Sequence, residues 1–273
     1  MSADTCGGQS ELDKRGAREI EGAQGPRGAE QGMQLRICHL YPELMSTYGD
    51  RGNVIALERR AEWSGMRVRT DEVSVGDALP EDCDFYFIGG GQDLAQGTVA
   101  EDLCREKAGA LRRVWDAGAV IFSICGGYQL LGRAYRDAHG GLLEGIGILD
   151  VETVARPGRL IGDVVARSAL EGSEGKTLVG FENHGGRTYL GPEARPLARV
   201  VRGAGNNGGD GTEGAVQGTC YGTYLHGAML PKNPWLADHL LRRALARRHS
   251  SFELPSLDDS LEERLHASRT AIR

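Results

Sequence analysis

The feature that most constrains the fold is an alternation of strand-like runs with amphipathic segments over the first half of the chain. The strand-like runs lie at 35–41, 66–73, 83–88 and 119–124, and segments of helical spacing lie between them at 52–63 and about 98–117. Strands that alternate with helices indicate a parallel sheet, because a parallel connection needs a long crossover. The sequence therefore predicts an α/β protein with a doubly wound, mostly parallel sheet flanked by helices.

The second half of the chain carries shorter strand-like runs after about residue 146. They begin at 147, 161, 177, 197 and 219, and a helix rich in Leu and Ala follows at about 234–248. We expect these runs to complete the same single sheet with an antiparallel edge. Residues 1–32 have many glycines and charges and almost no apolar period, so we expect a disordered N-terminal extension. The predicted division is an extension at 1–32, one domain at 33–250 and a helical C-terminal tail at 251–273.

Composition and charge exclude several classes of protein. The chain has 32 Lys and Arg against 38 Asp and Glu, a formal net charge of −6, which does not favour a nucleic-acid partner. No apolar run approaches the ~18 residues of a membrane-spanning helix and no signal-peptide pattern is present, so we expect a cytoplasmic protein with no membrane insertion. The six cysteines form no Cys-x-x-Cys pair, which indicates reduced thiols and predicts neither a disulfide framework nor a metal site.

Two glycine-rich stretches have only part of a nucleotide-binding pattern. EGSEGKT at 171–177 lacks the first glycine of a phosphate-binding loop, because Leu170 stands in that place. GAGNNG at 203–208 is followed by a further loop, whereas a dinucleotide site needs a helix there. We therefore expect no ATP site and no cofactor in this chain.

SICGGYQLLG at 123–132 places one cysteine between an apolar strand and a helix. Glycines at 126 and 127 allow a sharp bend and leave the thiol open to a substrate. The thiol would face the positive end of the helix, which favours the thiolate, and the amide of Gly126 would point toward a developing oxyanion. A structural thiol would fit better inside the preceding run. We therefore predict that Cys125 is a nucleophile.

A thiolate hydrolase also needs a general base, and two of the seven histidines end strand-like runs. His226 in GTYLHG lies at the carboxyl end of a predicted strand, the edge at which parallel α/β sheets place their sites. His184 in GFENHGG also closes a strand. The residues favour His226 and leave His184 open. The glycine triplet 89–91, which follows another strand, can present backbone N–H groups to an anion.

These features together resemble a class I glutamine amidotransferase domain, which has a flavodoxin-like fold. The chain from about 35 to 250 is similar to the cobyric-acid-synthase-like branch, and within it to glutaminase subunits that serve a Mur-type ligase. The similar stretches are FIGGGQD, ICGGYQLLG, LEGIGILD, GFENHGGRTY, GNN and GTYLHG. The resemblance implies a glutaminase that hydrolyses L-glutamine to glutamate and ammonia. It implies that Cys125 is the nucleophile, that His226 is the general base and that Arg159 binds the α-carboxylate of glutamine through its planar fork.

The expected mechanism gives roles to further residues. Gly126 and either Gly90 or Gly91 would stabilise the oxyanion of the tetrahedral intermediate. Gln129, one turn after the nucleophile, would line the substrate pocket, although a place on the helix surface fits its spacing equally well. We interpret Asp50 and Asn53 in GDRGN as turn and helix N-cap residues with no role in the chemistry.

One departure from the broader class bears on partners. Its members carry a glutamate two residues after the catalytic histidine, which fixes the imidazole tautomer, whereas this chain has Ala228 there. We therefore expect a second chain to supply the third member of the triad. The resemblance implies a heterodimer with a MurT-like Mur ligase, which would bind ATP and Mg²⁺ and use the ammonia to amidate the D-glutamate of the lipid II stem peptide in peptidoglycan biosynthesis. Lipid II would be reached through that partner.

Two alternatives stay open at this point. A stand-alone cysteine hydrolase of the same fold would turn over without a partner. A non-catalytic glutamine-binding module would bind glutamine and release no ammonia. The presence of both Cys125 and His226 argues against the binding module, and the missing acidic residue after His226 argues against the stand-alone hydrolase.

Overall fold

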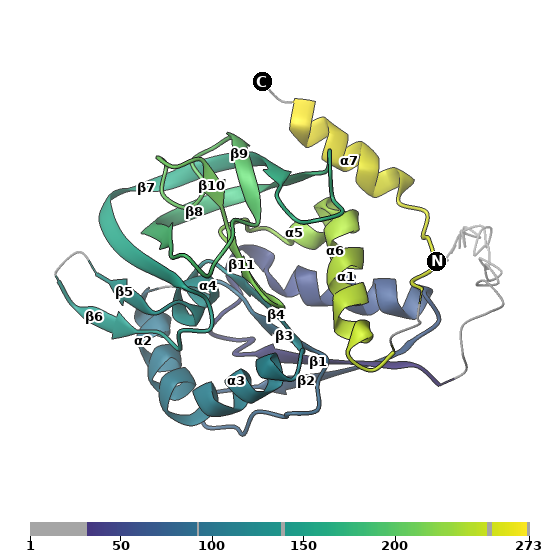
Figure 1. Ribbon diagram of the computed structural model, residues 1–273, viewed down its shortest axis with the longest axis horizontal. Helices are drawn as coiled ribbons and strands as arrows, with labels where there is room; N and C mark the ends of the chain where they lie inside the picture. The colour runs from purple at the N-terminus through teal and green to yellow at the C-terminus, as the bar shows by residue number, and fades with distance from the viewer. Residues whose placement is uncertain (1–31, 92, 138–139, 250–252, 272–273) are drawn as a thin grey trace, which may run out of the picture.

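The computed structural model of the chain describes residues 32–91, 93–137, 140–249 and 253–271, with only the backbone for 93–96. The predicted N-terminal extension lies outside these residues, apart from Gly32. Figure 1 shows two sheets, one with helices on both of its sides and the other formed largely by long strands. The first of these sheets carries the candidate site.

The first sheet is parallel in every pairing except the last. Its strands in spatial order are β11 (Ala215–Gln217), β12 (Cys220–Thr223), β4 (Val120–Ile124), β3 (Phe85–Ile88), β1 (Gln34–Leu40) and β2 (Arg67–Val73). Only β11 pairs antiparallel, with β12. Strands β3 and β4 are buried along their whole length, as expected of central strands covered on both faces. The predicted α/β class and the mostly parallel sheet with an antiparallel edge are confirmed.

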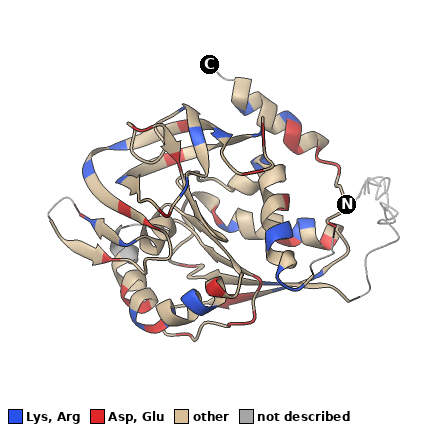
Figure 2. Ribbon diagram, in the orientation of Figure 1, with Lys and Arg blue, Asp and Glu red and all other residues tan. Residues whose placement is uncertain are grey.

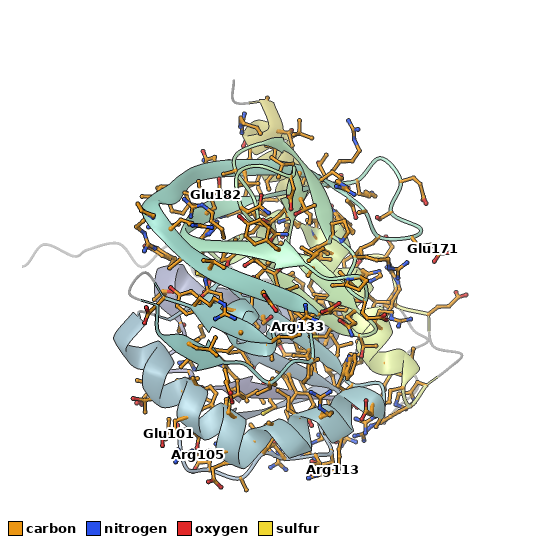
Figure 3. The ribbon with its side chains drawn as sticks, turned by 60° about the vertical axis from the view of Figure 1, so that its left-hand side comes forward. Glu101, Arg105, Arg113, Arg133, Glu171 and Glu182 are labelled. Atoms are coloured by element: carbon orange, nitrogen blue, oxygen red, sulfur yellow. The ribbon has the colours of Figure 1, made fainter. Side chains whose placement is uncertain are left out.

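Helices cover both faces of this sheet (Figure 1). Helix α1 (Arg51–Trp63) packs on β1, β2 and α6 (Pro234–Ala246). On the other side, α2 (Asp93–Asp102) runs through a π-helical turn at Leu103–Lys107 into α3 (Ala108–Asp116). Right-handed crossovers that leave the middle of a sheet in opposite directions place their helices on opposite faces. Figure 3 shows Glu101, Arg105 and Arg113 on the outer surface of this second helical layer.

A second sheet corrects the expectation of a single one. Its strands are β10 (Thr212–Glu213), β9 (Ala198–Arg202), β7 (Val151–Ser168), β5 (Ala134–Arg136) and β6 (Leu142–Glu144), with β8 (Thr177–Leu190) paired to β7. Strands β7 and β8 form a long antiparallel ribbon with an irregularity between Ala155 and Leu160. The prediction was wrong here because an alternating pattern identifies a half-buried strand but not the sheet that it joins. Only the last part of the second half, β11 and β12, joins the first sheet.

Charged side chains lie mostly away from the central strands, which are largely tan in Figure 2. Arg60 on α1 is an exception, since it is only 4% exposed. Its Nε donates to Asp238 Oδ1 on α6 (2.8 Å), and its two Nη atoms donate to the carboxylate of Asp259 (2.5 and 2.9 Å). Asp259 directly precedes α7 (Ser260–Ala271), which lies in the predicted C-terminal tail.

Among the described residues, no helix is both long and apolar enough to cross a membrane.

Arg60→Ala should lower the free energy of unfolding by about 3 kcal/mol, because it removes the buried cation that two largely buried carboxylates share. Urea denaturation measures this loss. The control is Arg59→Ala, whose exposed side chain pairs with Glu62 and should matter by less than about 0.5 kcal/mol. Equal losses in the two variants would contradict the assignment of the buried network.

Candidate active site

Cys125 lies in the sharp turn between β4 and α4 (Gly126–Leu131), as the sequence predicts. Its backbone has φ 48° and ψ −103°, a conformation that residues with a side chain rarely adopt. The Cys125 N–H donates to the Thr223 carbonyl of β12 at 2.8 Å, which ties the turn to the neighbouring strand. Gly127 fits because it has no side chain, since a Cβ there would lie 2.7 Å from the Ile88 carbonyl oxygen. The turn is therefore built to hold the thiol in one strained position.

Two cavities meet at Cys125. The larger, about 550 Å³, is lined by residues that include Gln129, Arg159 and His184. The smaller, about 360 Å³, is lined by Thr47, Tyr48, Gly91, Cys125, Arg159, Asn183 and His226. Gly91, Cys125 and Arg159 line both cavities, so the sulfur stands where they join. Within the described part of the chain, no group of three or more His, Cys, Asp or Glu residues is arranged to hold a metal ion.

His226 follows β12 and lines the smaller cavity together with Cys125. Burial would lower the pKa of His226, but hydrogen bonding to Asp50 and interaction with the Cys125 sulfur together raise it to about 10. The imidazole Nδ1 lies 3.2 Å from Asp50 Oδ2. Its Nε2 has no hydrogen-bond partner among the described residues. Catalytic contacts of this kind are often open without substrate and close when it binds, and Nε2 is thus the nitrogen left for the sulfur.

Asp50 is the functional residue that sequence analysis missed. Asp50 stands at the N-cap position of α1, as expected, but its side chain makes no capping hydrogen bond, so the expectation that this side chain only caps the helix is wrong. The carboxylate is fully buried, accepts a hydrogen bond from the Gly90 N–H (2.8 Å) and lies at Nδ1 of His226. A carboxylate there keeps the proton on Nδ1 and orients the ring. The expectation that a second chain must supply this group is corrected, because the carboxylate at His226 belongs to the same chain.

The neighbours of Asp50 explain why the acidic residue is found there and not after the histidine. Ala228 packs directly on α1, since a Cβ on Gly52 would lie 2.6 Å from the Ala228 Cβ. A longer side chain at this contact would push α1 away. Asn53 is structural, as expected: its Nδ2 donates to the Asp50 carbonyl (3.0 Å) and its Oδ1 accepts from the Leu230 N–H (2.9 Å).

Only the order of the strands in the parallel sheet could have indicated a role for Asp50. The residue lies 176 positions from His226, so no local motif links the two. It does follow β1, a neighbour of β3 in the parallel sheet. The carboxyl ends of parallel strands share one edge, and loops after β1, β3, β4 and β12 therefore gather there. An acidic side chain in any of these loops was a candidate.

The glycine triplet differs in part from the prediction. The N–H of Gly90 is taken by Asp50, so Gly90 is wrong as an oxyanion donor in this structure. Its missing side chain instead makes room for His226, because a Cβ would lie 2.5 Å from Cε1 of the ring. Gly91 lines both cavities, and its N–H has no partner among the described residues. Gly126 occupies the first position of α4, where no intrahelical carbonyl reaches the amide. Gly91 and Gly126 therefore stay the predicted donors.

Gln129 and Arg159 line the larger cavity beside Cys125. Gln129 is only 6% exposed and its Nε2 donates to the Tyr224 hydroxyl at 3.1 Å, so the helix-surface alternative is wrong. Arg159 lies on β7, and its Nε and Nη2 donate to the side-chain and backbone oxygens of Asn183 (2.6 and 2.7 Å). These contacts leave one edge of the guanidinium for a carboxylate.

His184, the alternative base, has a different environment. Its Nδ1 donates to the Gly186 carbonyl (2.8 Å), and its ring stacks on Tyr224 with centroids 3.6 Å apart. The nearest carboxylate oxygen, on Glu182 of β8 (Figure 3), is 3.7 Å from Nε2. The structure therefore favours His226 as the base, since a carboxylate at hydrogen-bond distance orients that ring and the Cys125 sulfur interacts with it.

Residues 36–234 match the family model of the CobB/CobQ-like glutamine amidotransferase domain, and the chain belongs to this family. Among its relatives, the GatD subunit of lipid II isoglutaminyl synthase (glutamine-hydrolyzing) from Staphylococcus aureus is 40% identical over 230 residues, which cover 84% of this chain and 92% of the relative. GatD from Streptococcus pneumoniae is 39% identical over 235 residues, covering 85% and 89%. A probable cobyric acid synthase from Methanothermobacter thermautotrophicus is 36% identical, over 57% of this chain and 32% of the relative.

Solved structures agree on the architecture. A glutamine amidotransferase from Thermotoga maritima superposes with a TM-score of 0.51 at 15% identity, covering 86% of this chain and 93% of that one. The glutaminase domain of Trypanosoma brucei CTPS, with bound acivicin, gives 0.51 at 11% identity, covering 81% and 96%. At such identities the likeness concerns the fold alone, and it confirms the predicted class I glutamine amidotransferase fold.

Asp50→Asn should lower the pKa of His226, because it removes the carboxylate that favours the imidazolium. The native ring should keep its proton through neutral pH and lose it only near pH 10, whereas the variant ring should lose it at a lower pH. NMR titration of the His226 ring protons measures both. Asp116→Asn, an exposed carboxylate at the end of α3, serves as the control and should leave the titration unchanged. The account is contradicted if Asp50→Asn titrates like the native protein.

Proposed function

We propose that this chain is the glutaminase subunit of a lipid II isoglutaminyl synthase, in which it hydrolyses L-glutamine to glutamate and ammonia. The observation that carries the proposal is the triad of Cys125, His226 and Asp50 where two cavities join. The similarity to two GatD subunits over most of the chain supports the substrate and the assembly. The family supports the glutamine-hydrolysing chemistry.

The first half of the reaction cleaves the amide. Glutamine would lie with its α-carboxylate at the free edge of Arg159 and its side-chain amide at Cys125. The sulfur attacks the amide carbon, and the N–H groups of Gly91 and Gly126 stabilise the oxyanion. His226 is protonated at neutral pH and donates its Nε2 proton to the departing nitrogen. The C–N bond breaks, ammonia leaves, and a γ-glutamyl thioester remains on the sulfur.

The second half returns the enzyme to its starting state. The Cys125 sulfur contributes to the raised pKa of His226, so loss of its negative charge in the thioester lowers that pKa. The imidazole can then accept a proton from water, which attacks the thioester carbonyl. Glutamate leaves, the sulfur regains its charge, and the imidazolium forms again. Asp50 holds the ring through both halves.

The ammonia needs an acceptor, which we propose is on a MurT-like Mur ligase in a heterodimer with this chain. The ligase would bind ATP and Mg²⁺ and activate the D-glutamate carboxylate of the lipid II stem peptide, so this chain would reach lipid II only through its partner. We propose a cytoplasmic complex, because the ligase step uses ATP. Asp50 makes the stand-alone hydrolase a more serious alternative than the sequence indicated, since the triad is complete within one chain.

The fate of the amide nitrogen tests the proposal. The chain and its co-expressed ligase are given glutamine labelled with ¹⁵N in the amide, together with ATP, lipid II and excess unlabelled ammonium. We expect ¹⁵N in the amidated lipid II. Cys125→Ala should lower ammonia release from glutamine by about a thousandfold or more, while amidation from free ammonium persists. Mass spectrometry of the lipid and an ammonia assay give both readouts.

The controls separate the alternatives. Cys104→Ala, which removes a partly exposed thiol that lines neither cavity, should behave as the native chain does. Ammonia released with no ¹⁵N in lipid II would indicate a stand-alone hydrolase. Glutamine binding without ammonia release, alone and with the ligase, would indicate the non-catalytic module and overturn the proposal.

A further inference from the structure

We propose that Asn183, anchored by Tyr48, is a positioning residue that fixes the guanidinium of Arg159 for the α-carboxylate of glutamine. The inference rests on the proposed function, because it takes glutamine as the substrate. Asn183 lies on β8, and all three residues line the smaller cavity together with Cys125 and His226.

Asn183 holds one edge of the Arg159 guanidinium. Its Oδ1 accepts from Nε at 2.6 Å, and its backbone oxygen accepts from Nη2 at 2.7 Å. Nε and Nη2 lie on the same edge of the planar group, so the adjacent edge, Nη1 with the second hydrogen of Nη2, is the fork that can bind a carboxylate through two parallel bonds. Nη1 has no hydrogen-bond partner among the described residues. Since Arg159 is an exposed side chain, its free edge has a fixed direction only while Asn183 holds the other.

Tyr48 holds the other side of the Asn183 amide. The Asn183 Nδ2 donates to the Tyr48 hydroxyl at 2.6 Å. The Arg159 Nε can only donate, so it requires the amide oxygen, and the amide nitrogen then faces Tyr48, whose hydroxyl accepts from it. Without the hydroxyl, the amide loses its second anchor, and the position of its oxygen is less fixed. The hydrogen bonds to Arg159 and to Tyr48, on opposite sides of the Asn183 amide, therefore together hold the guanidinium.

The Tyr48 side chain is itself held by the catalytic machinery. Its ring packs edge-to-face on the His226 imidazole, with centroids 4.9 Å apart. Its backbone has φ 56°, which is unfavourable for a bulky residue and persists only where the surroundings fix it. Tyr48 also lies two residues before Asp50, so one turn carries both the ring and the carboxylate that contact His226. The hydrogen bonds that position Arg159 are thus connected, through Tyr48, to His226, the proposed general base.

Two reagents for Cys125 test this inference. Acivicin is an amino acid with an α-carboxylate, whereas iodoacetamide alkylates the same sulfur and has no carboxylate. In Asn183→Ala we expect the rate of inactivation by acivicin to fall, and the KM for glutamine to rise, by about tenfold or more. The rate with iodoacetamide should stay within about twofold of native, because that reagent does not use Arg159. Tyr48→Phe keeps the ring and should show a smaller change in the same direction.

Epistasis and a matched control sharpen the test. In an Arg159→Gln background, Asn183→Ala should have almost no further effect on the rate of inactivation by acivicin or on the KM for glutamine, because the arginine that Asn183 positions is absent. Tyr189→Phe removes the hydroxyl of a different exposed tyrosine, which lies on β8, and should match the native chain.

The outcomes distinguish the inference from the proposed function. Native rates with acivicin and a native KM in Asn183→Ala would overturn the inference while leaving the glutaminase intact. Equal falls in the inactivation rates with acivicin and with iodoacetamide, together with a lower melting temperature, would show that Asn183 only supports the fold. That result would also overturn the inference. If neither reagent labels Cys125 in the native chain, the proposed function fails first.

Discussion

The site depends on one buried carboxylate. Asp50 has no solvent exposure, and an ionised group in that position is costly unless it is paired and hydrogen-bonded. It meets this requirement by accepting the Gly90 N–H and lying against Nδ1 of His226, so it joins the loops that follow β1, β3 and β12. Each of these loops contributes to the position of the imidazole, and their common edge of the parallel sheet is what brings them together.

The same arrangement supports the proposed double role of His226 as acid and as base. The carboxylate and the sulfur both favour the imidazolium, which suits the protonation of departing ammonia. Acylation removes the negative charge of the sulfur and leaves the carboxylate of Asp50. The pKa of His226 therefore falls, and the ring can accept a proton from water. The strained turn at Cys125 keeps the sulfur where the two cavities join, and a strained backbone is kept only where the surrounding structure compels it.

Sequence patterns predicted those parts of the molecule that local physics determines. The alternation of strands and helices predicted the parallel sheet, and a cysteine followed by two glycines after a buried strand predicted the sharp turn that holds Cys125, the proposed nucleophile. What they could not predict depends on contacts distant in sequence. Nothing near Asp50 reveals that its carboxylate meets His226, and nothing in the period of β7 and β8 reveals that they pair with each other in a second sheet. Gly90 is a further example. The sequence predicts that its N–H donates to an anion, but it does not reveal that this anion is the carboxylate of Asp50.

The most direct test of the central claim is to trap the covalent intermediate. Native protein is mixed with glutamine, quenched in acid during turnover and digested, and the peptide that carries Cys125 is weighed by mass spectrometry. The account predicts a γ-glutamyl adduct on Cys125 that accumulates further when Asp50 is replaced by asparagine, since hydrolysis of the thioester needs an oriented imidazole. Ammonia release with no adduct on Cys125, or with the adduct on another residue, would contradict it.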